Sequence, residues 1–143
     1  MLQRKDNWQS ALHAYLEGLR EVRFGYGAFD CGLFAAGAIE AVTGVDMAEP
    51  LRGSYRSRSE ALCAIGRLCG GSTAADVAEY LTRLHGLPEV RIQFAWRGDL
   101  VQIGRGRASR FGLVSISGRH LLTPGRVGLV SLPLIRADRA WRV

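Results

Sequence analysis

The hydrophobic pattern changes its period near Pro88, and this change limits the chain to a small set of folds. Before Pro88, apolar residues recur at helical spacing over about 8–19, 31–43, 58–69 and 74–85. After it, short apolar or alternating stretches lie between Gly-rich turns, at 90–94, 99–103, 111–117, 120–123 and 127–134. Helices followed by short strands with tight turns indicate an α+β fold, with the N-terminal helices packed on a C-terminal antiparallel sheet.

Length and local signals agree with this division. A chain of 143 residues fits one domain, so we predict a single domain over 1–143, with a helical half over about 6–86 and a sheet half over about 89–143. Ser57 with Glu60 three residues later is a capping-box pattern, and Gly44 stands where a helix-ending glycine is expected. Small residues such as Gly37 in the second helix predict close packing against another element.

The basic residues point to no particular ligand. The net charge of +6 comes from 19 Lys+Arg against 13 Asp+Glu, and Lys5 is the single lysine. The dominance of arginine is typical of a GC-rich genome. Arg105, Arg107 and Arg110 cluster in a Gly-rich connection, which we interpret as a solvated turn. No predicted helix has a basic face suited to reading bases, so a nucleic-acid partner is the least favoured of the alternatives.

Targeting, redox and metal signals are absent from the sequence. No apolar segment follows the charged N-terminal residues, so we expect no signal peptide, and no stretch has the length of a membrane span. Three cysteines are an odd number in a chain without an export signal, which favours reduced thiols. Cys63 and Cys69 lack the spacing of a zinc site and are expected to pack in the core or at a helix end. We expect no metal and no cofactor.

Asp30-Cys31 at the start of the second helix is the candidate site. A cysteine there meets unpaired backbone N–H groups and the positive end of the helix dipole. Both favour the thiolate, so we expect a lowered pKa and a nucleophilic Cys31. Asp30 is expected to cap the helix. The alternative is that Cys31 is only a small buried apolar residue.

The stretch Phe24-Gly25-Tyr26-Gly27-Ala28-Phe29-Asp30-Cys31 and the later Arg97-Gly98-Asp99-Leu100-Val101 together resemble the NlpC-type papain-like peptidoglycan hydrolases. Further matches are similar to a subset of that family found among tail genes of phages and prophages. They are Trp8, Thr43-Gly44-Val45-Asp46, Leu51-Arg52-Gly53-Ser54-Tyr55 and Ala140-Trp141-Arg142-Val143. The resemblance covers about residues 8–134 and implies a papain-like fold with Cys31 at the nucleophile position.

The sequence departs from that family where the catalytic base belongs. Active members begin the strand after the Gly-Asp strand with a histidine, and this chain has Phe111 there, preceded by Arg110. Neither side chain can take a proton from a thiol near neutral pH. The third, orienting position of the family falls at Leu122 or Thr123. His120 is the remaining candidate for a substitute base, and the resemblance places it on the next strand, away from Cys31.

These observations lead to two hypotheses. The favoured one is a structural or assembly component of a phage-type tail, at its tip or baseplate, built on a degenerate cysteine-hydrolase fold. Its partners would be other tail proteins, and it would reside in the virion tail after assembly in the host cytoplasm. The alternative is an active cysteine peptidase or amidase that cleaves peptidoglycan, with Cys31 as nucleophile and His120 or a partner's histidine as base.

Overall fold

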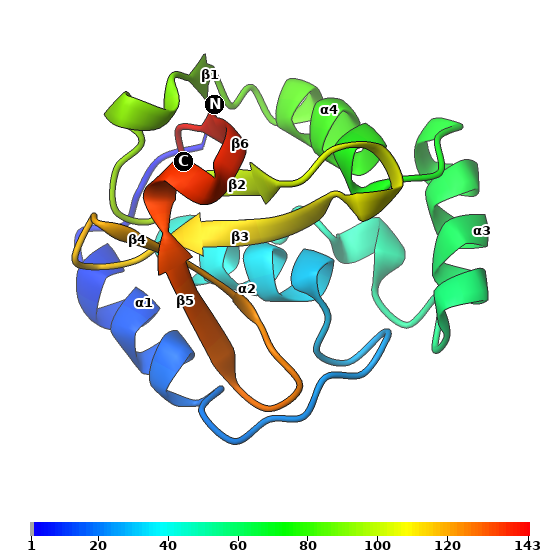
Figure 1. Cartoon of the computed structure of the whole chain (residues 1–143), viewed down its shortest axis with the longest axis horizontal. Coiled ribbons are helices and arrows are strands. Elements are labelled where there is room, and N and C mark those ends of the chain that lie inside the picture. Colours follow the sequence, from blue (N-terminus) through cyan, green and yellow to red (C-terminus); the bar gives the residue numbers. More distant parts are fainter. Residues whose placement is uncertain (1) are drawn as a thin grey trace.

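The computed structural model describes residues 2–143 and has an α+β architecture, with the N-terminal helices packed against a C-terminal sheet (Figure 1). The four α-helices are α1 (Trp8–Glu17), α2 (Cys31–Thr43), α3 (Arg58–Cys69) and α4 (Ala74–Leu84). The six strands are β1 (Glu89–Val90), β2 (Leu100–Ile103), β3 (Arg110–Val114), β4 (His120–Pro124), β5 (Leu129–Pro133) and β6 (Ala137–Trp141). The predicted α+β class, with N-terminal helices packed on a C-terminal antiparallel sheet, is confirmed.

The helix ends follow from local hydrogen bonds. Gly44 ends α2 in the left-handed conformation at φ 84°, as predicted. The complete capping box lies at α4, where Thr73 and Asp76 each accept a hydrogen bond from the other's backbone N–H. At α3 only half of the predicted box forms. Ser57 accepts from the Glu60 amide, but the Glu60 carboxylate accepts from the backbone N–H of the residue before Ser57.

The sheet is antiparallel throughout, with strand order β1-β6-β2-β3-β4-β5. One predicted strand is wrong: after Val90 the chain forms a short 3-10 helix, η2 (Ile92–Phe94). Phe94 is 62% exposed, so the alternation there does not mark a buried sheet face. No strand was predicted at β6, in which buried Ala137, Ala140 and Trp141 flank two charged residues and which pairs with both β1 and β2.

Polar partners explain why β6 is stable within the sheet. The Asp138 carboxylate accepts a hydrogen bond from the Gly104 amide at 2.7 Å. Arg139 donates to Glu79 of α4 and to Glu89 of β1, which ties the helix to this edge of the sheet. These hydrogen bonds lower the pKa of both glutamates and raise that of Arg139.

Helix α2 is the central helix and packs on β3 and β4. Its face is made of small and apolar residues, so neighbouring elements approach closely. At Gly37 an added Cβ would lie 2.3 Å from the Tyr15 hydroxyl of α1, and that hydroxyl donates to the Phe34 carbonyl at 2.8 Å. Burial raises the pKa of Tyr15 to about 12. The close packing predicted for α2 is confirmed at this contact.

The Gly-Asp stretch before β2 anchors both ends of the chain, which lie near one another in Figure 1. The fully buried Asp99 carboxylate accepts from the Trp96 and Val143 amides at 2.8 and 3.0 Å and pairs with Arg4 at 3.1 Å. Arg4 also donates to the Val143 carbonyl at 2.8 Å. Burial raises the pKa of Asp99, and these donors oppose that rise.

Candidate functional site

Asp30 organises the turn that leads into α2. Its carboxylate accepts from the Leu33 amide at 2.9 Å, which caps the helix as predicted, and from the Gly27 amide at 2.9 Å. The Tyr55 hydroxyl donates to the same carboxylate at 2.7 Å. Gly27 has a φ of 82°, and an added Cβ would lie 2.0 Å from the Tyr55 carbonyl oxygen. The carboxylate therefore has three donors and serves as a structural group.

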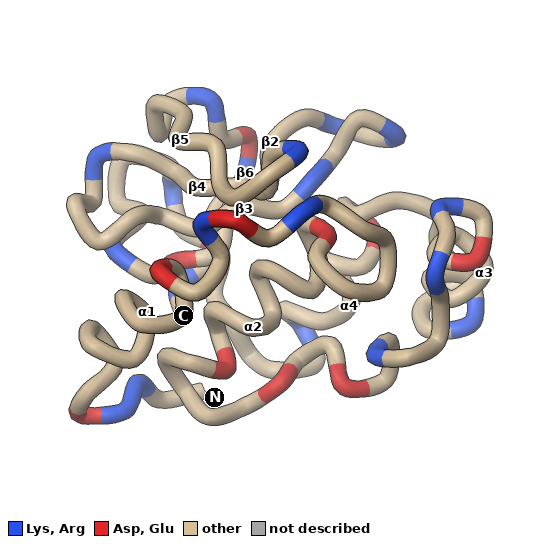
Figure 2. The backbone as a smooth tube through the Cα atoms, turned by 90° about the horizontal axis from the view of Figure 1, so that it is seen from below, with Lys and Arg blue, Asp and Glu red and all other residues tan. Residues whose placement is uncertain are grey.

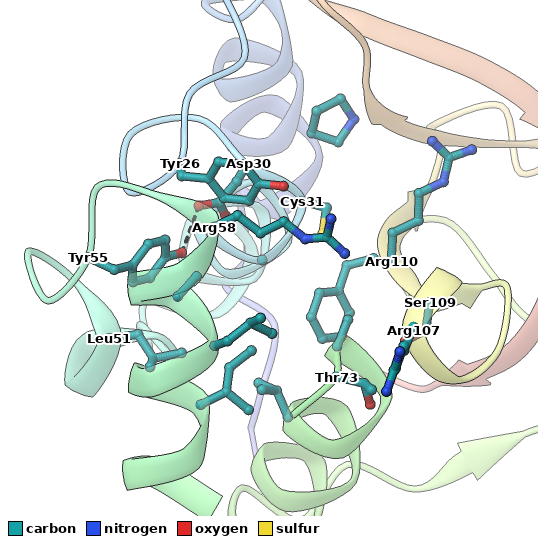
Figure 3. A pocket seen from close by; sticks show the side chains of 18 of the residues that line it. Tyr26, Asp30, Cys31, Leu51, Tyr55, Arg58, Thr73, Arg107, Ser109 and Arg110 are labelled. Carbon is teal, nitrogen blue, oxygen red and sulfur yellow. Dashed lines mark hydrogen bonds between the residues drawn. The ribbon is translucent and has the colours of Figure 1, made fainter. Parts of the chain in front are cut away.

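Cys31 is the first residue of α2 and lines a cavity of about 600 Å³ between the helices and the sheet (Figure 3). The cavity wall combines apolar side chains with arginines from separate elements. Its lining includes Tyr26, Asp30, Tyr55, Arg58, Leu62, Ile65, Thr73, Val77, Arg107, Ser109, Arg110, Phe111 and Thr123. A cavity of this size is in the range of ligand sites, roughly 300–1,000 Å³.

The electrostatics of Cys31 correct the expectation of a lowered pKa. Burial raises the pKa of the Cys31 thiol, and the nearby Asp30 charge adds to the rise. The backbone amides of Phe111 and Gly32 and the charge of Arg110 act in the opposite direction but are outweighed. Desolvation of the thiolate therefore exceeds the contribution of the helix start. The thiol stays protonated near neutral pH.

Phe111 lies on β3 and contributes to the same cavity as Cys31. Its side chain is buried in the core on the α2 side of the sheet. The ring lies next to Gly32 of α2. Arg110, one residue earlier, is exposed and also borders the cavity. The structure thus brings Cys31 together with both residues that stand where the resemblance expects a histidine.

Thr123 and His120 lie at different places on β4. Thr123 is fully buried, lines the cavity and donates to the Phe111 carbonyl at 2.8 Å, so its hydroxyl already has a partner. His120 is exposed, pairs with Pro133 and does not line the cavity. His120 precedes Thr123 by three positions along the strand, which corresponds to about 10 Å. Within residues 2–143 no histidine lines the cavity: His13 is exposed on α1, and His85 caps α4.

Several cavity residues were not identified from the sequence. Tyr55 lies in a motif that carried the resemblance, but no pattern indicated its bond to Asp30. Arg58 begins α3 and carries no local signal of a site. The arginine cluster in the Gly-rich connection was interpreted as a solvated turn, and all three of its side chains are exposed, but no sequence signal indicated that their surroundings differ. Arg107 and Arg110 border the cavity, whereas Arg105 pairs with Asp138.

The remaining cysteines form no site. Cys69 donates to the Ile65 carbonyl at the end of α3, as expected for helix-end packing. Cys63 is exposed, so the expectation that it packs in the core or at a helix end is wrong. In residues 2–143 no group of three His, Cys, Asp or Glu side chains is arranged to hold a metal ion. In the same range, no helix is long and apolar enough to cross a membrane.

Comparisons with known proteins give a family for the chain. A search of curated proteins found no match. The model of a family described as a domain of unknown function, DUF6950, matches residues 3–143. Because that match spans nearly the whole chain, the protein belongs to the DUF6950 family.

Proposed function

We propose that this protein is a non-catalytic structural or assembly component of a phage-type tail, at the tail tip or baseplate. The proposed scaffold is a degenerate NlpC-type, papain-like cysteine hydrolase. Its partners are other tail-tip or baseplate proteins, and its place is the assembled tail, reached from the cytoplasm of the bacterial host. The tail assignment rests on the sequence motifs shared with tail-gene relatives of that family.

Loss of catalysis is supported by the residue that lines the cavity together with Cys31 at the family's base position, which is Phe111. A cysteine hydrolase needs a base within hydrogen-bond reach of the thiol, and Phe111 has no group that can accept a proton. Burial raises the pKa of Cys31 in addition, so little thiolate is present without a base. A fold can keep its shape after its chemistry is lost when its surface serves binding.

The alternative is an active peptidoglycan peptidase or amidase. Its support is that Cys31 lines a cavity at the N-terminus of α2, where backbone N–H groups could stabilise an oxyanion. It requires an imidazole from another protein, because His120 lies outside the cavity.

Two measurements test the proposal. The gene is replaced by a Cys31→Ala variant in a phage or prophage that encodes this chain, and purified tails are analysed by mass spectrometry. We expect the protein in assembled tails and equal assembly with wild type and variant. Purified wild type and Cys31→Ala are also incubated with peptidoglycan. Absence from tails refutes the tail role, and hydrolysis by wild type alone refutes the loss of catalysis.

A further inference from the structure

The cavity beside Cys31 carries a positive charge that the protein itself does not neutralise. Arg58 of α3, Arg107 of the short 3-10 helix η3 (Gly106–Ala108) and Arg110 of β3 all line it. Within residues 2–143 none of the three forms a salt bridge. Among the described residues, Asp30 is the one acidic residue of the lining, so three arginines against one aspartate leave the lining with a net charge of +2. The Asp30 carboxylate accepts hydrogen bonds from three donors of the turn and of Tyr55, which hold it in place at the start of α2.

Two helix N-termini add to this charge. Cys31 and Gly32 are the first two residues of α2, Thr73 is the N-cap of α4 and Ala74 is its first residue. All four line the cavity. The positive ends of both helix dipoles therefore act on the same space. Figure 3 shows Arg58 extending toward Cys31 from one side, with Arg107 and Arg110 on the other. A ligand in the cavity would meet cationic groups on opposite walls.

Between the arginines the wall is apolar and partly open to solvent. Phe24 and Leu62 are 41% and 44% exposed at this cavity, and Ile65, Val77 and Phe111 continue the apolar surface inward. Exposed apolar side chains next to unpaired charges are typical of a binding site. The complementary ligand has an apolar group flanked by anionic groups.

We propose that this cavity binds an acidic peptide segment of a partner protein. An aliphatic or aromatic side chain of the segment would pack against Leu62, Ile65 and Phe111, and its flanking carboxylates would pair with the three arginines. Arginine forks match carboxylates in geometry. This inference rests on the proposed function, because it names the partner chemistry of a non-catalytic assembly module.

The charge distribution favours a peptide over a nucleic acid. Figure 2 shows Lys and Arg spread over both the helical and the sheet halves of the chain, interleaved with Asp and Glu. A nucleic acid requires a continuous basic track along its backbone. Here the unpaired arginines converge on one apolar cavity instead.

The test uses a dye-labelled peptide, acetyl-Glu-Asp-Leu-Leu-Asp-Glu, and a version with amides in place of the acids. Fluorescence anisotropy at low salt measures binding to wild type and to the triple variant Arg58→Gln, Arg107→Gln, Arg110→Gln. The matched control is Arg91→Gln, Arg119→Gln, Arg136→Gln. It removes the same charge at exposed arginines outside the cavity that form no salt bridge.

We expect the cavity variant and the amide peptide each to weaken binding at least ~10-fold, because charge-assisted hydrogen bonds are lost. The control variant should stay within about twofold, because its three arginines lie outside the cavity and cannot pair with a peptide bound there. Saturating peptide should slow alkylation of Cys31 but not of the exposed Cys63. Equal weakening by both triple variants, absence of binding, or displacement of the peptide by a tighter-binding oligothymidine overturns the proposal.

The same samples separate this inference from the proposed function. Mass spectrometry of the peptide after incubation shows whether it is cleaved. Binding with Cys31-dependent cleavage supports the site and refutes the non-catalytic function. Failure of binding with no cleavage refutes the site and leaves the tail role to the particle analysis.

Discussion

Placing an imidazole at position 111 tests directly whether this side chain faces the sulfur of Cys31. Phe111 lines the cavity with Cys31, and its backbone amide is close enough to influence the thiol. In Phe111→His the imidazole would take the place of the ring in the cavity wall that Cys31 also lines. An imidazolium partner lowers a cysteine pKa into the range of about 3.5–7.5.

The expected gain in reactivity can be worked out. An ordinary cysteine with a pKa of about 8.5 is ~3% thiolate at pH 7, and burial keeps Cys31 below that fraction. A paired cysteine with a pKa of about 7 is ~50% thiolate, at least ~15-fold more. Nucleophilicity falls about fivefold over the same change in pKa. The net alkylation rate at pH 7 should therefore rise at least ~3-fold.

The assay is alkylation by iodoacetamide between pH 5.5 and 10, followed by peptide mapping with mass spectrometry. The map reports each cysteine separately, so the exposed Cys63 serves as internal reference. Wild-type Cys31 should react with a midpoint above about pH 8.5, the ordinary value for a cysteine, and in Phe111→His the midpoint should move to near or below pH 7.

A second variant separates a base from simple exposure. Phe111→Asn opens a similar space but provides no titratable group, so its midpoint should stay above that of an ordinary cysteine. Circular dichroism confirms that both variants fold, because replacing a buried phenylalanine costs up to ~3 kcal/mol of apolar burial. An unchanged midpoint in a folded Phe111→His would show that position 111 does not face the thiol. The assignment of Phe111 to the missing base would then be wrong.

Three further predictions concern stability and are measured by urea unfolding. Asp30→Ala should lower the free energy of unfolding by about 3–5 kcal/mol, because it removes a helix cap and leaves buried donors unpaired. Tyr55→Phe should lower it by less, and equal losses for the two variants would contradict this hydrogen-bond network. Gly37→Ala should destabilise through the clash with Tyr15, whereas Gly37→Ala with Tyr15→Phe should recover part of the loss; no destabilisation by the single change would contradict the close contact. Since Arg139 lowers the pKa of its two glutamate partners, their contribution is present above about pH 4.5 and lost as pH falls through the lowered pKa values. On acidification, the free energy of unfolding should therefore fall less in Arg139→Gln than in wild type. The difference should be under ~1 kcal/mol because these ion pairs are half exposed. A difference that persists in 1 M salt would contradict an ionic origin.

Much of the fold was predictable because it depends on local signals. The four helices and most strands follow from hydrophobic period and from residues such as Gly44, whose conformation is set within one turn. The errors occurred where tertiary contacts decide. Strand β6 has no alternating apolar pattern that would mark it in the sequence. Its Asp138 and Arg139 are stabilised by partners far away in the sequence, which only the folded chain brings close. The segment containing Phe94 has the alternating pattern of a strand, but the Phe94 side chain is exposed and not covered by another element.

The site was predictable in position but not in chemistry. Asp30-Cys31 was placed correctly at the start of α2 because capping is local. The pKa of Cys31 was expected to fall because helix geometry was the only contribution visible in the sequence. Burial, which acts in the opposite direction and is larger, arises from packing against β3. Sequence position can therefore identify a helix-start cysteine, but not its protonation state.

Tertiary packing also distinguishes the arginines of the Gly-rich connection from one another. In the sequence, Arg107 and Arg110 lie beside Arg105 in one connection, and a solvated turn is the simplest interpretation. In the structure, Arg105 forms a salt bridge with Asp138. Arg107 and Arg110 instead line the cavity, on the side opposite Arg58 (Figure 3). Neutralisation is thus selective: Arg105, which does not line the cavity, forms a salt bridge, whereas within residues 2–143 the two arginines that line it form none. Phe111 beside Cys31, together with three arginines that form no salt bridge within residues 2–143, supports the proposal that this cavity holds an anionic segment rather than cleaves one.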